Sequence, residues 1–303
     1  MKHFIDIERV KIQNNEFSCN NTEVFKVGDL IQISEKIDGS NASATYNSST
    51  GKLDCFSRKK ELDWSNTLEG FWDYVQELDV TRWAAYPDLV IFGEWCRKNK
   101  IRYNDDWYGK WIVYDIWDAR REEWMLQSDV KEICKALGLE YIHVLYEGEF
   151  ISWEHCKSFC HSPFYGPTQE GVVVKNQTRL NCKVNTPTVL KIVNEEFSEI
   201  KKHHNIQKND PITEKVTKLV KIIVTERRVE KMLMKLREEG ILPELIEPKD
   251  MRIVAQNLPR RVYEDCLKEE KEILLAIGKY SEEGGKMIAN ETMRLAKQLI
   301  LGN

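Results

Sequence analysis

The sequence has no long apolar run and no excess of positive charge. No stretch approaches the roughly 18 apolar residues that a membrane-spanning helix needs, and the opening segment MKHFIDIERV lacks the apolar core of a secretory signal. The 45 lysines and arginines stand against 49 aspartates and glutamates, for a formal net charge of −4. This balance argues against a protein coated with basic surface, although it leaves room for a local basic groove. We therefore expect a cytoplasmic or otherwise intracellular protein with no membrane partner.

The eight cysteines are scattered and show no disulfide framework. A chain of 303 residues can bury a core without disulfide bonds, so we expect reduced thiols. A zinc site could be built from one local group: His155, Cys156, Cys160 and His161. Ser152 precedes this group as a helix N-cap residue, and the two cysteines would then lie one turn apart on an ordinary short helix. We favour that helix over zinc, because no second pair of ligands with suitable spacing lies nearby.

The pattern of apolar residues changes near residue 200, which predicts two domains. Residues 1–200 are dominated by short runs of β-type residues, and residues 212–303 by apolar positions at helical spacing. Between them the polar segment KKHHNIQKNDP, residues 201–211, predicts a linker. The predicted fold class is α+β, with an antiparallel-sheet domain followed by an all-helical domain.

Strands and helices are expected at definite places in this scheme. The expected strands are Leu30–Lys36, Ala42–Tyr46, Leu53–Ser57, Leu89–Glu94, Trp111–Trp117, Tyr141–Tyr146, Gly171–Lys175 and Val189–Val193. One helix should carry the apolar residues from Leu68 to Leu78, and another should run from about Ser128 to Leu137 and end at Gly138. Apolar stripes of the helical domain are Ile212–Ile223, Val262–Ile277 and Met287–Leu301.

Six short segments of the first domain place charged or aromatic residues inside or at the ends of the expected strands. A purely structural sheet seldom has such residues there. In order they are EKIDGSN (35–41), SRKKEL (57–62), FGEW (92–95), YDIW (114–117), EGVVVK (170–175) and LKIV (190–193). Their ordered occurrence is a stronger signal than any one of them.

Lys36 follows an apolar run and precedes Asp38 and Gly39, which places its amine at a strand-to-turn junction. Glycine at this position allows close approach of the backbone. A lysine attacks phosphorus only when its amine is neutral, so burial or a neighbouring cation must lower its pKa. Lys191, at the end of another apolar run, is a candidate for that cation. A surface lysine after a strand is the alternative for Lys36 taken alone.

Four other residues of these segments suit a nucleotide site. Glu94 and Glu170 lie at the ends of apolar strands, where a divalent cation or a ribose hydroxyl could provide the partner that a buried carboxylate needs. Their alternative is an ion pair at the edge of a sheet. Tyr114 could stack on a purine or belong to the core. Arg58, in a polar turn, could bind phosphate or remain solvated.

In these segments the chain resembles the covalent nucleotidyltransferase superfamily of ATP-dependent DNA ligases, RNA ligases and mRNA capping enzymes. The resemblance covers residues 35–193 and implies a nucleotidyltransferase domain with an ATP-grasp-like ligase fold. Glu35, within motif I, is then expected to contact ATP. The other roles follow by matching position. Lys36 resembles the motif I nucleophile, Arg58 a phosphate or substrate contact, and Glu94 a ribose contact. Tyr114 resembles the ring stacked on the base, Glu170 the metal-binding carboxylate, and Lys191 a phosphate contact. The catalytic set is Lys36, Glu94, Glu170 and Lys191, with Glu94 and Glu170 near the metal.

The C-terminal part distinguishes among branches of this superfamily. It has neither the Arg-x-Asp-Lys-type motif nor the run of five strands of an OB-fold. Together with Asn41, the helical tail resembles the RNA ligase 2 family of nick-sealing phage ligases and kinetoplastid RNA-editing ligases. Asp38 and Asn41 are then expected near the nucleic acid, with Asn41 positioning the 5′-phosphate end.

The chain departs from that family in two places. Asp38 stands where the family commonly has histidine, and motif V lacks a second lysine after Lys191. Lys175 and Lys183 are candidates to replace that lysine in holding ATP phosphates. Both differences bear on the substrate more than on the chemistry.

The resemblance implies an ATP-dependent RNA ligase that uses Mg²⁺ or Mn²⁺ and joins RNA 3′-hydroxyl and 5′-phosphate ends in a nicked duplex. No obligate protein partner is evident in the sequence. A basic helical region that includes Arg227 and Arg228 is expected to bind nucleic acid, with a solvated helix face as the alternative. Three other functions remain open: a nick-sealing DNA ligase without an OB domain, a GTP-dependent capping transferase, and a non-catalytic RNA-binding module.

Overall fold

The structure is a computed structural model. It describes residues 2–5, 7–13, 16–18, 24–99, 101–180, 188–194, 197, 212–280 and 284–301. The predicted linker at 201–211 and the candidate Lys183 lie outside the described residues.

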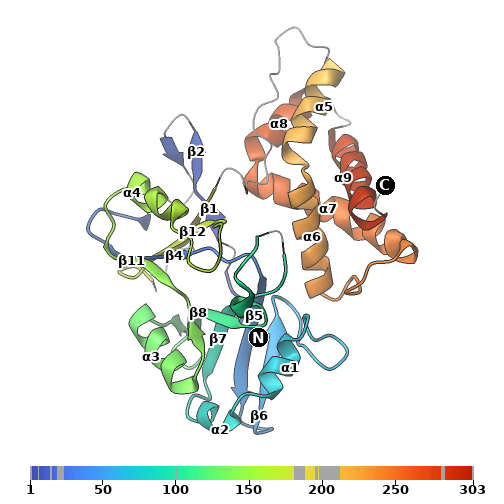
Figure 1. Cartoon of the computed structure of the whole chain (residues 1–303). Coiled ribbons are helices and arrows are strands. Elements are labelled where there is room, and N and C mark those ends of the chain that lie inside the picture. Colours follow the sequence, from blue (N-terminus) through green and yellow to red (C-terminus); the bar gives the residue numbers. More distant parts are fainter. Residues whose placement is uncertain are drawn as a thin grey trace. The chain divides into compact units, whose positions relative to one another are not determined.

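The chain divides into two compact units, Met1–Phe197 and Ser198–Asn303. The first contains β-sheets with short helices packed against them, and the described part of the second is helical (Figure 1). In the described part of the chain, no helix combines the length and the apolar character that a membrane crossing requires.

One sheet of the first unit has β5 and β7 at its centre. Its order is β10-β8-β7-β5-β6, with β9 beside β8, and every pairing except β10–β8 is antiparallel. Three helices bury apolar side chains against one face, including Phe71, Trp83 and Val130. The bounds are β5 Ser40–Asn47, β6 Lys52–Ser57, α1 Phe71–Gln76, α2 Val80–Trp83, β7 Leu89–Trp95, η2 Asp105–Trp107, β8 Trp111–Asp118, β9 Glu123–Trp124, α3 Gln127–Leu137 and β10 Glu140–Tyr141.

The second sheet has the order β1-β13-β12-β4-β11, and β1–β13 is its one parallel pairing. Apolar residues at alternate positions of β4, β12 and β13 pack with Phe150, Cys156 and Cys160 in a separate core. The bounds are β1 Glu8–Arg9, β4 Leu30–Glu35, β11 Val144–Glu149, α4 Trp153–Ser158, η3 Phe159–His161, β12 Gly171–Asn176 and β13 Val189–Val193, with a separate hairpin of β2 Lys11–Gln13 and β3 Glu16–Ser18.

The helical unit forms its own apolar core from five helices of the described segments. Thr225 begins α6, because its side chain accepts a hydrogen bond from the Arg228 backbone N–H. Gly240 follows α6 with a φ of +60°, a conformation that favours glycine. The bounds are α5 Ile212–Ile223, α6 Glu226–Glu238, η5 Pro248–Asp250, α7 Met251–Glu269, α8 Lys271–Tyr280 and α9 Gly284–Leu301.

The expected mixture of largely antiparallel sheets and C-terminal helices is confirmed. The expected strand Tyr141–Tyr146 is instead two strands, since its ends pair in different sheets. The helix expected from Leu68 to Leu78 is shorter, because Leu68 itself has a positive φ. Ser152 caps α4 as predicted, and Gly138 ends α3 in the left-handed conformation.

Candidate active site

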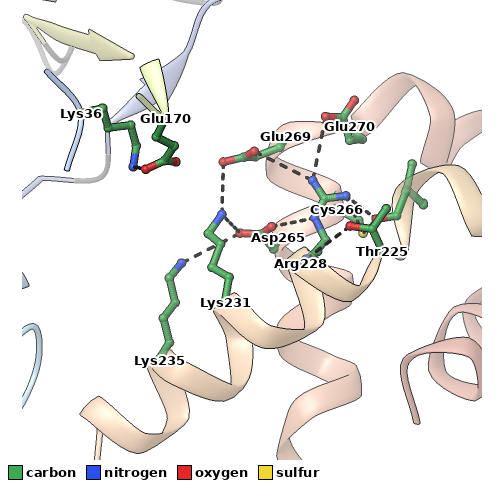
Figure 2. Close-up of polar contacts among 11 residues, drawn as sticks. Lys36, Glu170, Thr225, Arg228, Lys231, Lys235, Asp265, Cys266, Glu269 and Glu270 are labelled. Atoms are coloured by element: carbon green, nitrogen blue, oxygen red, sulfur yellow. Dashed lines mark hydrogen bonds and ion pairs between the residues drawn. The ribbon is translucent and has the colours of Figure 1, made fainter. Parts of the chain in front are cut away.

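Lys36 lies directly after β4, at the turn that leads into β5. Its backbone N–H donates to the Gly171 carbonyl at 2.9 Å, which ties the turn to the start of β12. Its Nζ lies 2.5 Å from Oε2 of Glu170, the residue before β12 (Figure 2). Pairing of β4 with β12 therefore brings the predicted nucleophile and a predicted metal ligand together from positions 134 residues apart.

The Lys36 amine is held in its charged form. Burial alone would lower its pKa, but the Glu170 carboxylate, and to a smaller extent Asp38 and Glu94, raise the pKa above its ordinary value. This net effect is opposite to the lowered pKa that a nucleophile requires. The reason is that the Glu170 carboxylate at 2.5 Å, together with Asp38 and Glu94, favours the ammonium form more strongly than burial opposes it.

Asp38 is held by the segment that follows β7. Its carboxylate accepts hydrogen bonds from Asn99 Nδ2 at 2.9 Å and from the Ile101 N–H at 3.4 Å. Its own backbone N–H donates to the Tyr103 hydroxyl at 2.5 Å. Burial and the nearby Glu170 raise the pKa of Asp38 to about 6. The turn that carries Lys36 is thus fixed on its C-terminal side by three contacts to one loop.

Glu94 lies near the end of β7, and its Oε1 accepts the Gly39 N–H at 3.1 Å. A Cβ on Gly39 would lie 2.5 Å from the Trp95 carbonyl oxygen, so glycine permits the close approach that was predicted here. Asn41 pairs with Glu94 in the β5–β7 register and donates from its side chain to the Tyr114 hydroxyl. The turn, Glu94 and the predicted base-stacking ring therefore form one connected group.

Tyr114 lies on β8 at an irregularity in its pairing with β7. Its ring contacts Phe4 edge-on, with centroids 4.8 Å apart. Burial and the charge of Glu94 raise its pKa, while the charge of Arg58 acts in the opposite direction. Arg58, directly after β6, therefore lies within electrostatic reach of this ring.

Glu35 is almost fully buried, with an exposed fraction of 1%. Its Oε2 accepts the backbone N–H groups of Phe164 at 2.7 Å and Tyr165 at 3.4 Å. Among the described residues its Oε1 has no hydrogen-bond partner. Burial raises the pKa of this carboxyl to about 7 despite the two backbone donors.

Lys175 is buried, and its amine is bonded to other residues of the first unit. Its Nζ lies 2.7 Å from Asp115 Oδ2 and donates to the Tyr114 carbonyl at 2.9 Å. Burial lowers the pKa of Lys175, and Asp115 partly offsets that effect. The pair connects β12 to β8 and holds the backbone at the Tyr114 irregularity.

Lys191 lies on β13, where it pairs with Val173 of β12, which in turn pairs with Ser34 of β4. Residues directly opposite one another project from the same face of a sheet. Lys191 thus shares a face with Ser34, two residues before Lys36. Strand β12 lies between β13 and β4, the strand that Lys36 follows.

The prediction that Arg228 contacts nucleic acid is wrong, because its side chain has an exposed fraction of 0%. Its guanidinium donates to Asp265 Oδ2 at 2.9 Å and to the Ile223 carbonyl at 2.5 Å (Figure 2). Glu269 and Glu270 each lie 3.9 Å from its Nη2. Arg228 therefore connects the start of α6 to α7 and to Glu270, the residue directly after α7.

Other basic residues of the same region are also engaged within the helical unit. Lys231 Nζ lies 3.3 Å from Asp265 and 3.7 Å from Glu269, and Lys235 reaches Asp265 at 4.0 Å. Arg227 is half-buried on α6. The acidic partners of both lysines, Asp265 and Glu269, lie on α7.

The histidine and cysteine group at 155–161 is not placed to hold a metal ion in the described structure. Cys156 and Cys160 are buried in the core of the second sheet. Burial raises the pKa of both thiols to about 12, which disfavours the thiolates that zinc needs. Across the described residues, no group of three or more histidine, cysteine, aspartate or glutamate side chains is placed to hold a metal ion.

Sequence patterns missed the residues that hold Asp38. Asn99 and Tyr103 lie in an irregular polar loop, where neither strand nor helix periodicity gives a signal. Asp115 was also missed, although a charged residue within the apolar strand YDIW was visible in the sequence.

Comparisons with known proteins identify the family of the chain. A family model described as RNA ligase matches residues 29–193, more than half of the chain. A comparison with curated protein sequences found no significant match. The fold is similar to that of an archaeal ATP-dependent RNA ligase in form 2, with a TM-score of 0.50 and 14% identity over 100% of this chain and 67% of that one. Form 1 gives a TM-score of 0.50 and 15% identity over 98% and 74%. The matched segment contains Lys36, Glu94, Glu170 and Lys191, and the chain belongs to the RNA ligase family.

Proposed function

We propose that this protein is an ATP-dependent RNA ligase that joins RNA 3′-hydroxyl and 5′-phosphate ends through a lysyl-AMP on Lys36. The observation that carries the proposal is the contact of Lys36 with Glu170, beside Asp38 and Glu94, within the segment matched by the family model. A surface lysine after a strand would not be surrounded by three carboxylates. The similar archaeal proteins are ATP-dependent RNA ligases by description, which agrees with the proposal.

The site residues suit ATP in distinct ways. Tyr114 offers an aromatic ring for the base, and Glu35, whose buried Oε1 has no hydrogen-bond partner among the described residues, is proposed to contact ATP. Arg58 and Lys191 carry positive charge suited to phosphates. Lys175 is expected to act through the Tyr114 backbone, since its amine is already paired with Asp115.

Glu94 and Glu170 fit a divalent cation of the Mg²⁺ or Mn²⁺ type. Both offer the oxygen ligands that hard cations prefer, and such ions are often held by one or two carboxylates together with substrate phosphates. Bound there, the cation would neutralise phosphate charge and weaken the hold of Glu170 on the Lys36 amine.

The proposed reaction begins when the neutral Lys36 amine attacks the α-phosphorus of ATP. An N–P bond forms, the bond to the bridging oxygen breaks, and pyrophosphate leaves with the electron pair. An oxygen of an RNA 5′-phosphate then attacks the AMP phosphorus and releases the lysine. The adjoining 3′-hydroxyl finally attacks the activated 5′-phosphate, forms the phosphodiester and releases AMP.

Asp38 and Asn41 are proposed to lie near the RNA ends, and Arg227 remains a candidate for a phosphate contact in the helical unit. Residues 1–200 would then act as the adenylyltransferase domain. No obligate protein partner is required by this scheme. Asp38 favours one second candidate, a nick-sealing DNA ligase without an OB domain, because the resemblance implies that aspartate at this position is more usual in DNA ligases.

The test is a sealing assay on nicked duplexes that differ only in whether the 3′-hydroxyl strand is RNA or DNA. We expect ATP- and divalent-cation-dependent sealing with the RNA strand and none by Lys36→Ala. Lys26→Ala, at an exposed lysine before β4, is the control and should seal like wild type. Preferential sealing of the DNA strand would support the second candidate, and sealing by Lys36→Ala would refute the proposed chemistry.

A further inference from the structure

Trp64 is 81% exposed. All nine tryptophans lie in the described part of the chain, and the other eight are buried or half-buried. Burial of an indole ring is among the larger favourable contributions to a fold. The fold gains little from Trp64, so a contact with a partner is the better explanation for a tryptophan at this position.

The turn that carries Trp64 has a fixed conformation. Asp63 Oδ1 accepts hydrogen bonds from Ser65 N at 2.7 Å, Ser65 Oγ at 2.6 Å and Asn66 N at 3.1 Å. The backbones of Asp63 and Asn66 also bond to each other in both directions. Trp64 is therefore held out by a rigid turn, which lowers the entropy cost of using its ring in binding.

Residues on both sides of this turn are fixed to the body of the unit. Leu62 and Leu68 are both buried in the core of the first sheet. After the turn, Leu68, Glu69 and Gly70 have successive φ values of +53°, +53° and +93°. Two non-glycine residues in this conformation are unfavourable, and such strain is often found at functional sites.

The loop that carries Trp64 begins and ends beside the candidate active site. It leaves β6 after Ser57, which pairs with Ala42 near the start of β5. It returns at Glu69, whose carbonyl accepts the Trp95 indole N–H at 3.2 Å and whose carboxylate pairs with Arg97. One end of the loop thus lies beside the start of β5, which follows the Lys36 turn, and the other beside the end of β7, which carries Glu94.

Basic side chains precede the exposed ring in the same loop. Arg58, Lys59 and Lys60 follow one another at the start of the same loop, and both lysines are exposed. Protein surfaces that bind single-stranded nucleic acid combine an aromatic ring, on which a base stacks, with cations that contact the phosphates. An apolar protein partner would not require the three cations.

We propose that Trp64 stacks on an unpaired base beside an RNA end, while Lys59 and Lys60 contact neighbouring phosphates. The proposal rests on the proposed function, since it takes RNA as the substrate. In the described structure, Trp64 makes no bond to the residues proposed to bind ATP. A variant at Trp64 can therefore change the binding of RNA without changing the formation of lysyl-AMP.

The test measures the affinity for a fluorescein-labelled, gapped RNA duplex, in which unpaired bases lie beside a 5′-phosphate, by fluorescence anisotropy without ATP. We expect Trp64→Ala to weaken binding about 5- to 150-fold, the range for loss of one base–aromatic stack. Trp64→Phe should retain most of the affinity, and Trp64→Leu should bind as weakly as Trp64→Ala. Val27→Ala, at a side chain that is 80% exposed in the turn before β4, is the control for loss of an exposed apolar group.

The salt dependence separates stacking from charge. Trp64→Ala should leave the slope of log affinity against log salt unchanged, whereas the double variant Lys59→Ala, Lys60→Ala should reduce it by about 1.4 to 1.8. Affinity of Trp64→Leu equal to that of wild type would overturn the proposal, and so would an absence of binding by the wild type.

Labelling with α-labelled ATP is run on the same samples and tests the proposed function separately. Failure of all proteins to label would refute the ligase chemistry, whereas labelled proteins with equal RNA affinity would refute the role of Trp64 alone. Because the assay compares the leucine and phenylalanine variants directly, it does not depend on the alanine variant folding.

Discussion

The buried carboxyl of Glu35 predicts an unusual dependence of stability on pH. Its exposed fraction is 1%, and its pKa is raised by burial from the ordinary 4.5 to about 7. Each pKa unit corresponds to about 1.4 kcal/mol. Ionised Glu35 should therefore destabilise the folded first unit by about 3 kcal/mol relative to the protonated form.

The sign follows from the protons bound in each state. Below pH 4.5 the group is protonated in both the folded and the unfolded chain, so its favourable contribution is fully present. Between about pH 4.5 and 7 only the folded chain retains the proton, and the free energy of unfolding falls as pH rises. Above about pH 7 the contribution of Glu35 is lost.

The assay is chemical unfolding of wild type and Glu35→Gln at pH 5 and pH 8. We expect Glu35 to lower the free energy of unfolding of the wild type by roughly 2–3 kcal/mol between pH 5 and pH 8. In Glu35→Gln this contribution should be absent. Glu147→Gln, at an exposed carboxyl on β11, is the matched control and should retain the wild-type dependence. Identical dependence in wild type and Glu35→Gln would refute the reasoning.

Three further variants test contacts around the site. Asn99→Ala removes a hydrogen bond to the Asp38 carboxylate and should slow formation of lysyl-AMP roughly 10- to 150-fold in a single-turnover assay, given about 1.5–3 kcal/mol for such bonds; an unchanged rate would contradict this. Lys175→Met leaves Asp115 buried without its cation and should cost about 3–5 kcal/mol of unfolding free energy in urea, whereas a loss under 1 kcal/mol would argue against a buried pair. Gly166→Ala should lower stability by about 1–3 kcal/mol in the same assay, because its Cβ would lie 2.3 Å from a backbone oxygen; wild-type stability would be the opposing result.

Strands with strong β patterns could be predicted closely from the sequence. The run Val189–Val193 is a strand with the same bounds in the structure. Periodicity alone did not reveal that Tyr141–Tyr146 divides between two sheets, because pairing partners are tertiary information. The apolar stripe Val262–Ile277 likewise gave no sign of the break between α7 and α8.

The candidate site could be predicted only as a set of residues, and not as a set of contacts. The ordered segments identified Lys36 and Glu170. The distance of 2.5 Å between Lys36 Nζ and Glu170 Oε2, however, depends on the pairing of β4 with β12. The same limit explains the error at Arg228. A basic residue on an amphipathic helix was taken as a surface group, whereas Asp265 pairs with it inside the unit.

The most direct test of the central claim is covalent labelling at Lys36. Protein treated with pyrophosphate, to discharge any bound AMP, would be incubated with α-labelled ATP and Mg²⁺, denatured, and digested for peptide mapping. We predict acid-labile label on the peptide that contains Lys36 in wild type and Lys26→Ala, and none in Lys36→Ala. Label on another lysine, or no label on the wild type with either Mg²⁺ or Mn²⁺, would contradict the account.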